Sequence, residues 1–287
     1  MEINKKIRVL NFKLSKILNW WLFWAYKSRF SGNWMEFSEH KEYLFWDHIK
    51  NIDWKASSKS DQMFVKKYEE ERDLNVLFFL DNTNSMKFWS HNKTKKELLE
   101  EVFYSLSLSA YNNNDNIWWV IFNEEKIDFI DYKKHISNVY KILEILEREN
   151  NNYWKEINKF DTIFKYLVNR KIKDNLIFIL TDNIDRVDEK LLRLSSSNND
   201  IIYVNIFDFL ENNLSGIDSS ISFSLWNNFL SVDLSDKDKV EKYNIYRNKK
   251  IEYNKAVFNK NNVWYIKLDT KSDIFKEITW YFNKIRK

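Results

Sequence analysis

The sequence predicts an α/β fold with a doubly wound, mostly parallel sheet and a β-rich or irregular N-terminal extension. Short apolar runs of buried-strand length alternate with segments whose apolar residues recur at helical spacing. This alternation implies a parallel sheet with helices on both faces. At 287 residues, the chain is long enough for one such domain and an extra layer. We therefore divide it into residues 1–72, an N-terminal segment packed on the sheet, and residues 73–287, the α/β domain.

The predicted strands and helices follow one another in a regular order. Residues 74–80 form a continuous apolar run that ends at Asp81, as a buried strand would. Thr94 and Glu97 fit a capping box, which predicts a helix beginning near Thr94. Further strands are expected at 118–122, 126–130 (an edge strand), 176–180, 201–207 and 263–268. Further helices are expected at 136–147, 162–169, 188–194 and 272–285.

Three stretches lack this alternation. Residues 1–30 are expected to form a basic helix or an irregular lead-in, and residues 31–72 to form short strands and turns. Residues 211–260 are polar, and we expect them to be irregular apart from hairpin strands at 221–225 and 229–232.

Composition excludes several kinds of protein. The chain has no cysteine, which excludes disulfides, thiolate metal sites and cysteine nucleophiles. Its net charge of +4 is spread along the sequence, so we expect no nucleic acid partner. The most apolar N-terminal stretch, residues 17–26, is far shorter than the roughly 20 residues of a membrane-spanning helix, and no signal-peptide cleavage pattern follows it. We therefore expect a cytoplasmic protein with no membrane insertion.

Glycine, proline and tryptophan occur in unusual numbers. The chain contains 2 glycines, no proline and 13 tryptophans, so residues such as asparagine must form its turns. Trp34, Trp46 and Trp89 stand where turns ordinarily require glycine, at positions where positive φ would be expected. One explanation is UGA recoding, in which codons that some bacteria read as glycine have been translated as tryptophan. The alternative is a drifted protein from an AT-rich genome, and UGG codons at these three positions would refute recoding.

Oxygen-bearing side chains follow the first predicted strand. Asp81, Thr83 and Ser85 occupy alternate positions directly after the apolar run. At the carboxyl end of a parallel strand, this spacing forms a compact cluster of hard oxygen ligands, which suits Mg²⁺, Mn²⁺ or Ca²⁺ rather than zinc. The alternative is a capped strand-to-helix turn, in which Asp81 and Ser85 only bind backbone amides.

Several segments carry the pattern of a known family. The chain reads Lys-Glu-Tyr-Leu-Phe-Trp-Asp at 41–47, Lys-Asn-Ile-Asp-Trp-Lys at 50–55 and Asp-Asn-Thr-Asn-Ser-Met at 81–86. Together with residues 24–37, these segments resemble the signature of the domain-of-unknown-function-58 (DUF58) family, and the C-terminal half is similar too. Tryptophan stands at three positions where that signature has glycine, which supports recoding: Trp24, Trp34 and Trp46.

The resemblance implies a fold and a role. The DUF58 family is similar to von Willebrand factor A domains, whose doubly wound sheet holds a metal-ion-dependent adhesion site (MIDAS) at the carboxyl ends of its strands. Carried over, that site comprises Asp81, Thr83 and Ser85 in the first loop, Thr162 in the second and Asp182 in the third. The resemblance also implies a protein-binding adaptor that works with a MoxR-type AAA+ ATPase on an unknown client protein.

The sequence offers little support for a stand-alone enzyme. It contains no phosphate-binding P-loop, no nucleophile elbow and no H-E-x-x-H zinc motif. Two catalytic alternatives use the same acids: a metal-dependent phosphohydrolase with Asp81 as nucleophile, and a metal-dependent nuclease built on Asp81, Asp182 and the N-terminal acids. A phosphohydrolase of this type would have a second acid two residues after Asp81, where Thr83 stands. We therefore expect no enzymatic activity.

The N-terminal acids Glu36, Asp47 and Asp53 could form a second acidic site. We favour a structural role, in which they form salt bridges that hold the N-terminal layer to the sheet. The expected basic partners are Arg29, Lys41 and Lys55.

Overall fold

A computed structural model of the chain describes residues 35–44, 47, 52–58, 62–70, 74–90, 92–123, 127–130, 136–147, 159–212, 220–225, 228–233, 236–274, 276–278 and 280. The chain divides into two compact units. One comprises Phe23–Asp73, and the other comprises Met1–Leu22 together with Leu74–Lys287. The predicted division into residues 1–72 and 73–287, with the first segment packed on the sheet, stays a prediction.

The smaller unit contains a two-stranded antiparallel sheet. Strand β1 (Met35–Glu42) pairs with β2 (Phe64–Glu70), and the short helix α3 (Trp54–Ser57) lies between them in the chain. Ile52 is joined to Val65 by an isolated bridge, and both side chains are buried. The described residues of this unit thus form the short strands and turns predicted for 31–72.

The larger unit is built on a six-stranded sheet. Its strands are β3 (Asn75–Asp81), β4 (Asn116–Phe122), β5 (Ile127–Ile130), β6 (Leu176–Thr181), β7 (Asp200–Phe207) and β10 (Trp264–Asp269). Their spatial order is β10-β7-β6-β3-β4-β5, and β5 runs antiparallel to β4 while the other neighbours are parallel. The central strands are almost wholly buried apolar runs because helices cover both faces. The predicted α/β fold with a mostly parallel sheet is confirmed.

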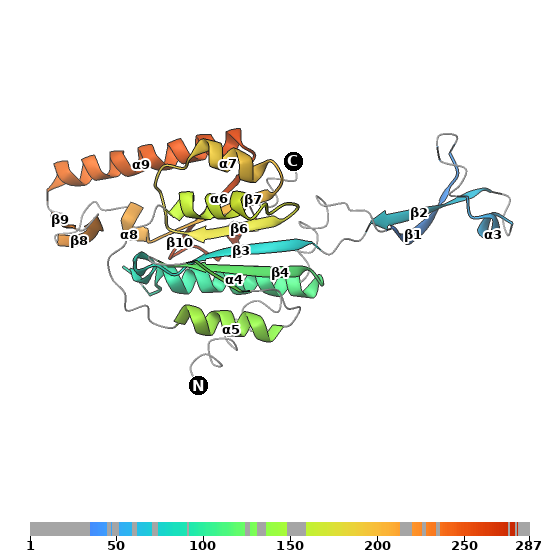
Figure 1. Ribbon diagram of the computed structural model, residues 1–287, viewed down its shortest axis with the longest axis horizontal. Helices are drawn as coiled ribbons and strands as arrows, with labels where there is room; N and C mark the ends of the chain where they lie inside the picture. The colour runs from blue at the N-terminus through green and yellow to red at the C-terminus, as the bar shows by residue number, and fades with distance from the viewer. Residues whose placement is uncertain are drawn as a thin grey trace. The chain divides into compact units, whose positions relative to one another are not determined.

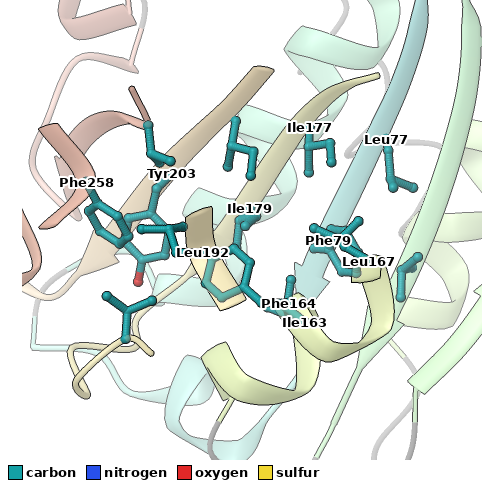
Figure 2. Close-up of a cluster of buried hydrophobic side chains, with 14 of the residues drawn as sticks. Leu77, Phe79, Ile163, Phe164, Leu167, Ile177, Ile179, Leu192, Tyr203 and Phe258 are labelled. Carbon is teal, nitrogen blue, oxygen red and sulfur yellow. The ribbon is translucent and has the colours of Figure 1, made fainter. Parts of the chain in front are cut away.

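The helices of this unit are α4 (Lys95–Asn112), α5 (Ile136–Glu147), α6 (Lys159–Asn169), α7 (Glu189–Ser196), α8 (Phe209–Asn212) and α9 (Lys237–Lys260). Figure 1 shows α4 and α5 on one face of the sheet and α6, α7 and α9 on the other. The side chains of β3 alternate between these two layers. Phe78 packs edge-on against Phe103 of α4, with ring centroids 5.3 Å apart. Phe79 points to the other face of the sheet, where it lies in a buried hydrophobic cluster with Phe164 of α6 (Figure 2).

Helix α9 contradicts the prediction that residues 211–260 are irregular. It is 24 residues long, and its buried positions recur at helical spacing: Val240, Arg247, Ile251, Asn254, Val257 and Phe258. Two of these buried residues, Arg247 and Asn254, are polar, so the apolar stripe is interrupted in the sequence. The predicted hairpin in the same region is present as β8 (Ser220–Leu225) and β9 (Asn228–Asp233).

Other elements begin close to their predicted positions. Helix α4 begins directly after Thr94, and both halves of the predicted capping box are formed with Glu97. Helix α6 and strand β4 each begin a few residues before their predicted starts. The predicted closing helix is helical at residues 274, 276–278 and 280, and its remainder lies outside the described residues, as does the lead-in 1–30.

The described tryptophans do not show the expected backbone strain. Trp119 is buried in β4, whereas Trp89 is exposed. Among the described residues other than glycine, φ is positive at Asn114, Lys171, Asp174 and Asn262. None of the described tryptophans is among these, so a left-handed backbone does not explain them. Positions 24, 34 and 46 lie outside the described residues, and recoding stays a prediction about the nucleotide sequence.

Candidate binding site at the carboxyl rim of the sheet

The carboxyl ends of β3, β6 and β7, with the loops that follow them, form a polar region that we call the rim. β3 ends at Asp81 and its parallel neighbour β6 ends at Thr181, and both side chains are fully buried. The Thr181 hydroxyl donates a hydrogen bond to Oδ2 of Asp81. This contact joins the first loop to the third. Thr181 was not predicted as a site residue, although it directly precedes Asp182 at a strand end.

The first loop gathers the three predicted oxygen ligands. The backbone amide of Thr83 donates to Oδ1 of Asp81 at 3.0 Å, and the Thr83 hydroxyl donates to the same oxygen at 2.6 Å. The hydroxyl oxygens of Thr83 and Ser85 are 3.0 Å apart. Thr83 is buried, whereas Ser85 is exposed at the start of a short 3₁₀ turn, Asn84–Lys87. The three side chains therefore form a compact oxygen cluster that reaches the surface at Ser85.

The third loop carries Asp182, which forms a salt bridge with a buried lysine. The Nζ atom of Lys95, the first residue of α4, lies 2.7 Å from Oδ2 of Asp182. The same Nζ lies 2.8 Å from Oε1 of Glu211 in α8. The side chain of Lys95 is only 2% exposed. Sequence reasoning did not predict Lys95 or Glu211 as members of the site.

The charge state of Lys95 follows from its surroundings. Burial by itself lowers the pKa of Lys95. The carboxylates of Asp182 and Glu211, together with their hydrogen bonds to the ammonium group, more than reverse this effect and raise the pKa above its ordinary value. Lys95 is therefore a cation at neutral pH.

An arginine of α9 extends this network. Nη2 of Arg247 lies 3.4 Å from Oε2 of Glu211, and Nη1 donates to the backbone carbonyl of Glu211. Arg247 is also buried. We call Asp182, Lys95, Glu211 and Arg247 the ion network. It connects the loop after β6 with α4, α8 and α9, and its two carboxylates face two cations.

A second buried acid links further segments of the rim. Asp208, the residue after β7, is fully buried. It accepts hydrogen bonds from the amide and the hydroxyl of Ser90, from the Thr270 hydroxyl at 3.2 Å and from the amide of Leu210 at 2.9 Å. Asp208 therefore holds the loop after β3 and the residue after β10 to the end of β7.

The structure places Thr162 in the first turn of α6, where its side chain is partly buried. The next two residues, Ile163 and Phe164, pack in one buried cluster with Phe79 and Ile179, close to the carboxyl ends of β3 and β6 (Figure 2). The start of α6 is therefore near the rim. A metal-ligating role for Thr162 stays a prediction.

The donor chemistry of the first loop fits a hard divalent cation. Asp81, Thr83 and Ser85 present one carboxyl group and two hydroxyls within hydrogen-bonding distance of one another. Within the described part of the chain, no three acidic, histidine or cysteine side chains gather into a metal-binding group. A cation site at the rim would therefore depend on hydroxyl oxygens as ligands. Asp182 already forms a salt bridge with Lys95.

Two acids of the smaller unit have structural partners. Both carboxylate oxygens of Asp47 lie 3.5 Å from Nζ of Lys41, which is the predicted salt bridge. Asp53 caps α3 by accepting hydrogen bonds from the amides of Lys55 and Ala56. Both sets of contacts lie within the smaller unit, and that of Asp53 is a helix cap and not a salt bridge, so the predicted role of these acids in holding the N-terminal layer to the sheet stays a prediction. Arg29 lies outside the described residues.

The fold and the rim define an α/β domain with a polar cluster at the carboxyl ends of its parallel strands, which is where such sheets ordinarily bind ligands. Residues 39–222 match the model of the family described as "Protein of unknown function DUF58". The chain belongs to this family. No curated protein matches the chain.

Solved structures similar to this chain share little sequence with it. The conserved hypothetical protein BatB from Bacteroides thetaiotaomicron has a TM-score of 0.47 and 12% identity, covering 74% of this chain and 98% of that one. The SpRpn10 VWA domain has a TM-score of 0.39 and 9% identity, covering 72% and 94%. An uncharacterized membrane spanning protein from Vibrio fischeri has a TM-score of 0.26 and 13% identity, covering 76% and 100%. None of the helices described for the present chain is both long and apolar enough to cross a membrane.

Proposed function

We propose that this chain is a non-enzymatic adaptor that binds proteins through the rim and works with a MoxR-type AAA+ ATPase in the assembly or maturation of other proteins. The rim binds a client or the ATPase, and ATP hydrolysis by the ATPase supplies the energy for assembly or maturation. Membership of the DUF58 family, which is similar to von Willebrand factor A domains, supports this role. The client protein is defined here only by one chemical property, an acidic side chain at its surface that can bind the cation.

The oxygen cluster of the first loop is the observation that supports the proposal best. Asp81, Thr83 and Ser85 lie together at 2.6 and 3.0 Å. With Thr162 and with Asp182 acting through water, they would hold Mg²⁺, or Mn²⁺ or Ca²⁺. When bound, the cation supplies an open coordination position for a carboxylate from the partner. Ser85 is the exposed member of the cluster, so the partner would approach from its side.

The geometry does not favour the two catalytic alternatives. A nucleophilic aspartate must reach a phosphorus atom, yet Asp81 is fully buried and accepts hydrogen bonds from the hydroxyls of Thr83 and Thr181. A nuclease needs several acids around its metal ions. Asp182 is instead paired with Lys95. Both observations support a binding role over a catalytic one.

The proposal predicts that Ser85→Ala weakens cation-dependent binding. The purified chain is expected to retain the MoxR-type ATPase of its own genome in a pull-down with Mg²⁺ and to release it with EDTA. Because Ser85→Ala removes one direct ligand, Mg²⁺ affinity measured by calorimetry should fall about tenfold or more, with parallel loss of the ATPase. Ser85 is exposed, so the variant should keep the stability of the parent chain.

Ser197→Ala is the matched control, because Ser197 is an exposed serine whose hydroxyl donates to a backbone carbonyl of α7 and accepts from the neighbouring Asn198 at the surface. It should leave both readouts unchanged. Two outcomes would contradict the adaptor role: retention of the ATPase regardless of cation and of Ser85, or Mg²⁺-dependent phosphatase or nuclease turnover that Asp81→Asn abolishes.

A further inference from the structure

Lys95 occupies a position that is electrostatically unfavourable for an unpaired cation. It is the first residue of the 18-residue helix α4, where the positive end of the helix dipole disfavours a positive charge. Its side chain is also buried, and an unpaired buried ammonium group costs several kcal/mol. The two carboxylates 2.7 and 2.8 Å away compensate for these costs, and the ring of Phe88, whose centroid is 5.8 Å from Nζ, adds a weaker cation–π contact. The ion pairs of Lys95 with Asp182 and Glu211 are therefore its strongest described contacts.

These contacts fix the two acids in place. Oε1 of Glu211 accepts from Lys95, while its Oε2 accepts from the amide of Asp208 at 3.0 Å and lies 3.4 Å from Arg247. Asp182 and Glu211 together face the cations of Lys95 and Arg247. The ion network is thus balanced in charge within the protein and creates no demand for an additional cation.

The oxygen cluster of the first loop and the ion network differ in whether they can supply ligands to a metal ion. Hydroxyl groups donate and accept, so Thr83 and Ser85 can turn their lone pairs from one another toward a cation. An ammonium group has three donors and no acceptor, so it repels a metal ion and cannot ligate one. A cation can therefore replace the hydrogen bonds of the first loop, but it must compete with a permanent positive charge at Asp182.

We propose that Lys95 is the positioning residue of the rim, a built-in counter-ion that holds Asp182 and Glu211 and keeps Asp182 from direct contact with a metal ion at Asp81, Thr83 and Ser85, so that Asp182 can act on it only through water. The position of that metal ion rests on the proposed function, whereas the counter-ion role of Lys95 does not. The proposal implies that removing the ammonium group converts Asp182 and Glu211 into a new site for a divalent cation. This consequence separates it from a role in packing alone.

The test measures thermal unfolding of the full chain with EDTA, MgCl₂ or CaCl₂. Lys95→Met keeps an unbranched side chain of similar length but takes from Asp182 the cation that it faces and leaves Glu211 with Arg247, so its Tm in EDTA should fall by roughly 6–20 °C. Millimolar Ca²⁺ should restore part of this loss, because carboxylate oxygens are the ligands it prefers and its coordination geometry is flexible. The wild-type chain should respond much less. Lys93→Met is the control, since Lys93 forms a partly exposed salt bridge with Glu101 and should change Tm little.

A double variant, Lys95→Met with Asp182→Asn, keeps the proposal testable if Lys95→Met does not fold. It removes one positive and one negative charge together and leaves Glu211 paired with Arg247, so its Tm should lie well above that of Lys95→Met and should not respond to Ca²⁺. Failure of the double variant to recover, or a Lys95→Met variant indifferent to both divalent ions, would show a packing role and overturn the proposal. Loss of cation response in the wild-type chain would instead contradict the proposed function and leave the role of Lys95 standing.

Discussion

Replacing Asp208 by alanine should lower the free energy of unfolding by about 3–5 kcal/mol. The carboxyl group of Asp208 is buried and accepts hydrogen bonds from Ser90, Leu210 and Thr270. Its removal leaves these donors without their acceptor in a place that water reaches poorly, and buried unsatisfied donors are costly. Urea unfolding followed by circular dichroism measures the loss directly.

Two further measurements make the Asp208 prediction specific. Hydrogen exchange should accelerate in residues 84–90, because Asp208 is what holds Ser90 to the end of β7. Asp208→Asn should lose less stability than Asp208→Ala, since the amide keeps one acceptor oxygen. Asp236→Ala provides the comparison: this acid caps α9 at the surface, and its loss should cost much less stability than the loss of Asp208. Equal effects for Asp208→Ala and Asp236→Ala would refute the structural role given to Asp208.

Replacing Phe258 by alanine should have an effect of similar size, about 3–5 kcal/mol. Phe258 of α9 is completely buried, and its ring centroid lies 5.0 Å from that of Tyr203 (Figure 2). It lies 6.0 Å from the ring centroid of Tyr265. Alanine would leave a cavity between α9 and the sheet and would remove both aromatic contacts. Chemical denaturation with two probes, far-UV circular dichroism and tyrosine and tryptophan emission, would measure the change.

The Phe258 variant should also disturb the third loop. The hydroxyl of Tyr203 donates to the backbone carbonyl of Asn183, which directly follows Asp182. Burial raises the pKa of Tyr203 well above its ordinary value, so this hydroxyl stays protonated as a donor. Ile245→Ala serves as the control on the same helix, because Ile245 is 47% exposed and should change stability by less than about 0.5 kcal/mol. A loss from Phe258→Ala no larger than that from Ile245→Ala would contradict the packing described for α9.

The elements that the sequence predicted correctly are those whose signal is local. The buried strand β3 is a continuous apolar run, and α4 begins at a capping box made by Thr94 and Glu97, three residues apart. Helix α9 was missed because Arg247 and Asn254 occupy its buried stripe. Their polar groups are bound by Glu211 and by the loop after β6, which lie far away in sequence.

The candidate site, like the fold, was predictable only where its residues are close together in the sequence. Asp81, Thr83 and Ser85 belong to one short loop, so their spacing alone indicated that their oxygens would meet. The salt bridges of Lys95 join residues 87 and 116 positions apart, to Asp182 and to Glu211. Nothing in the local pattern distinguishes Lys95 from the many exposed lysines of this chain. Only the fold, which brings the start of α4 beside the loop after β6, reveals its role.

The order of strands in the sheet has a consequence for how the chain folds during its synthesis. β3 is made first, β4 and then β5 are added on one side of it, and β6, β7 and finally β10 are added on the other. Every new strand therefore joins an edge of what the ribosome has already released. No strand must be inserted between two that have already paired, so the sheet can grow outward at the pace of translation.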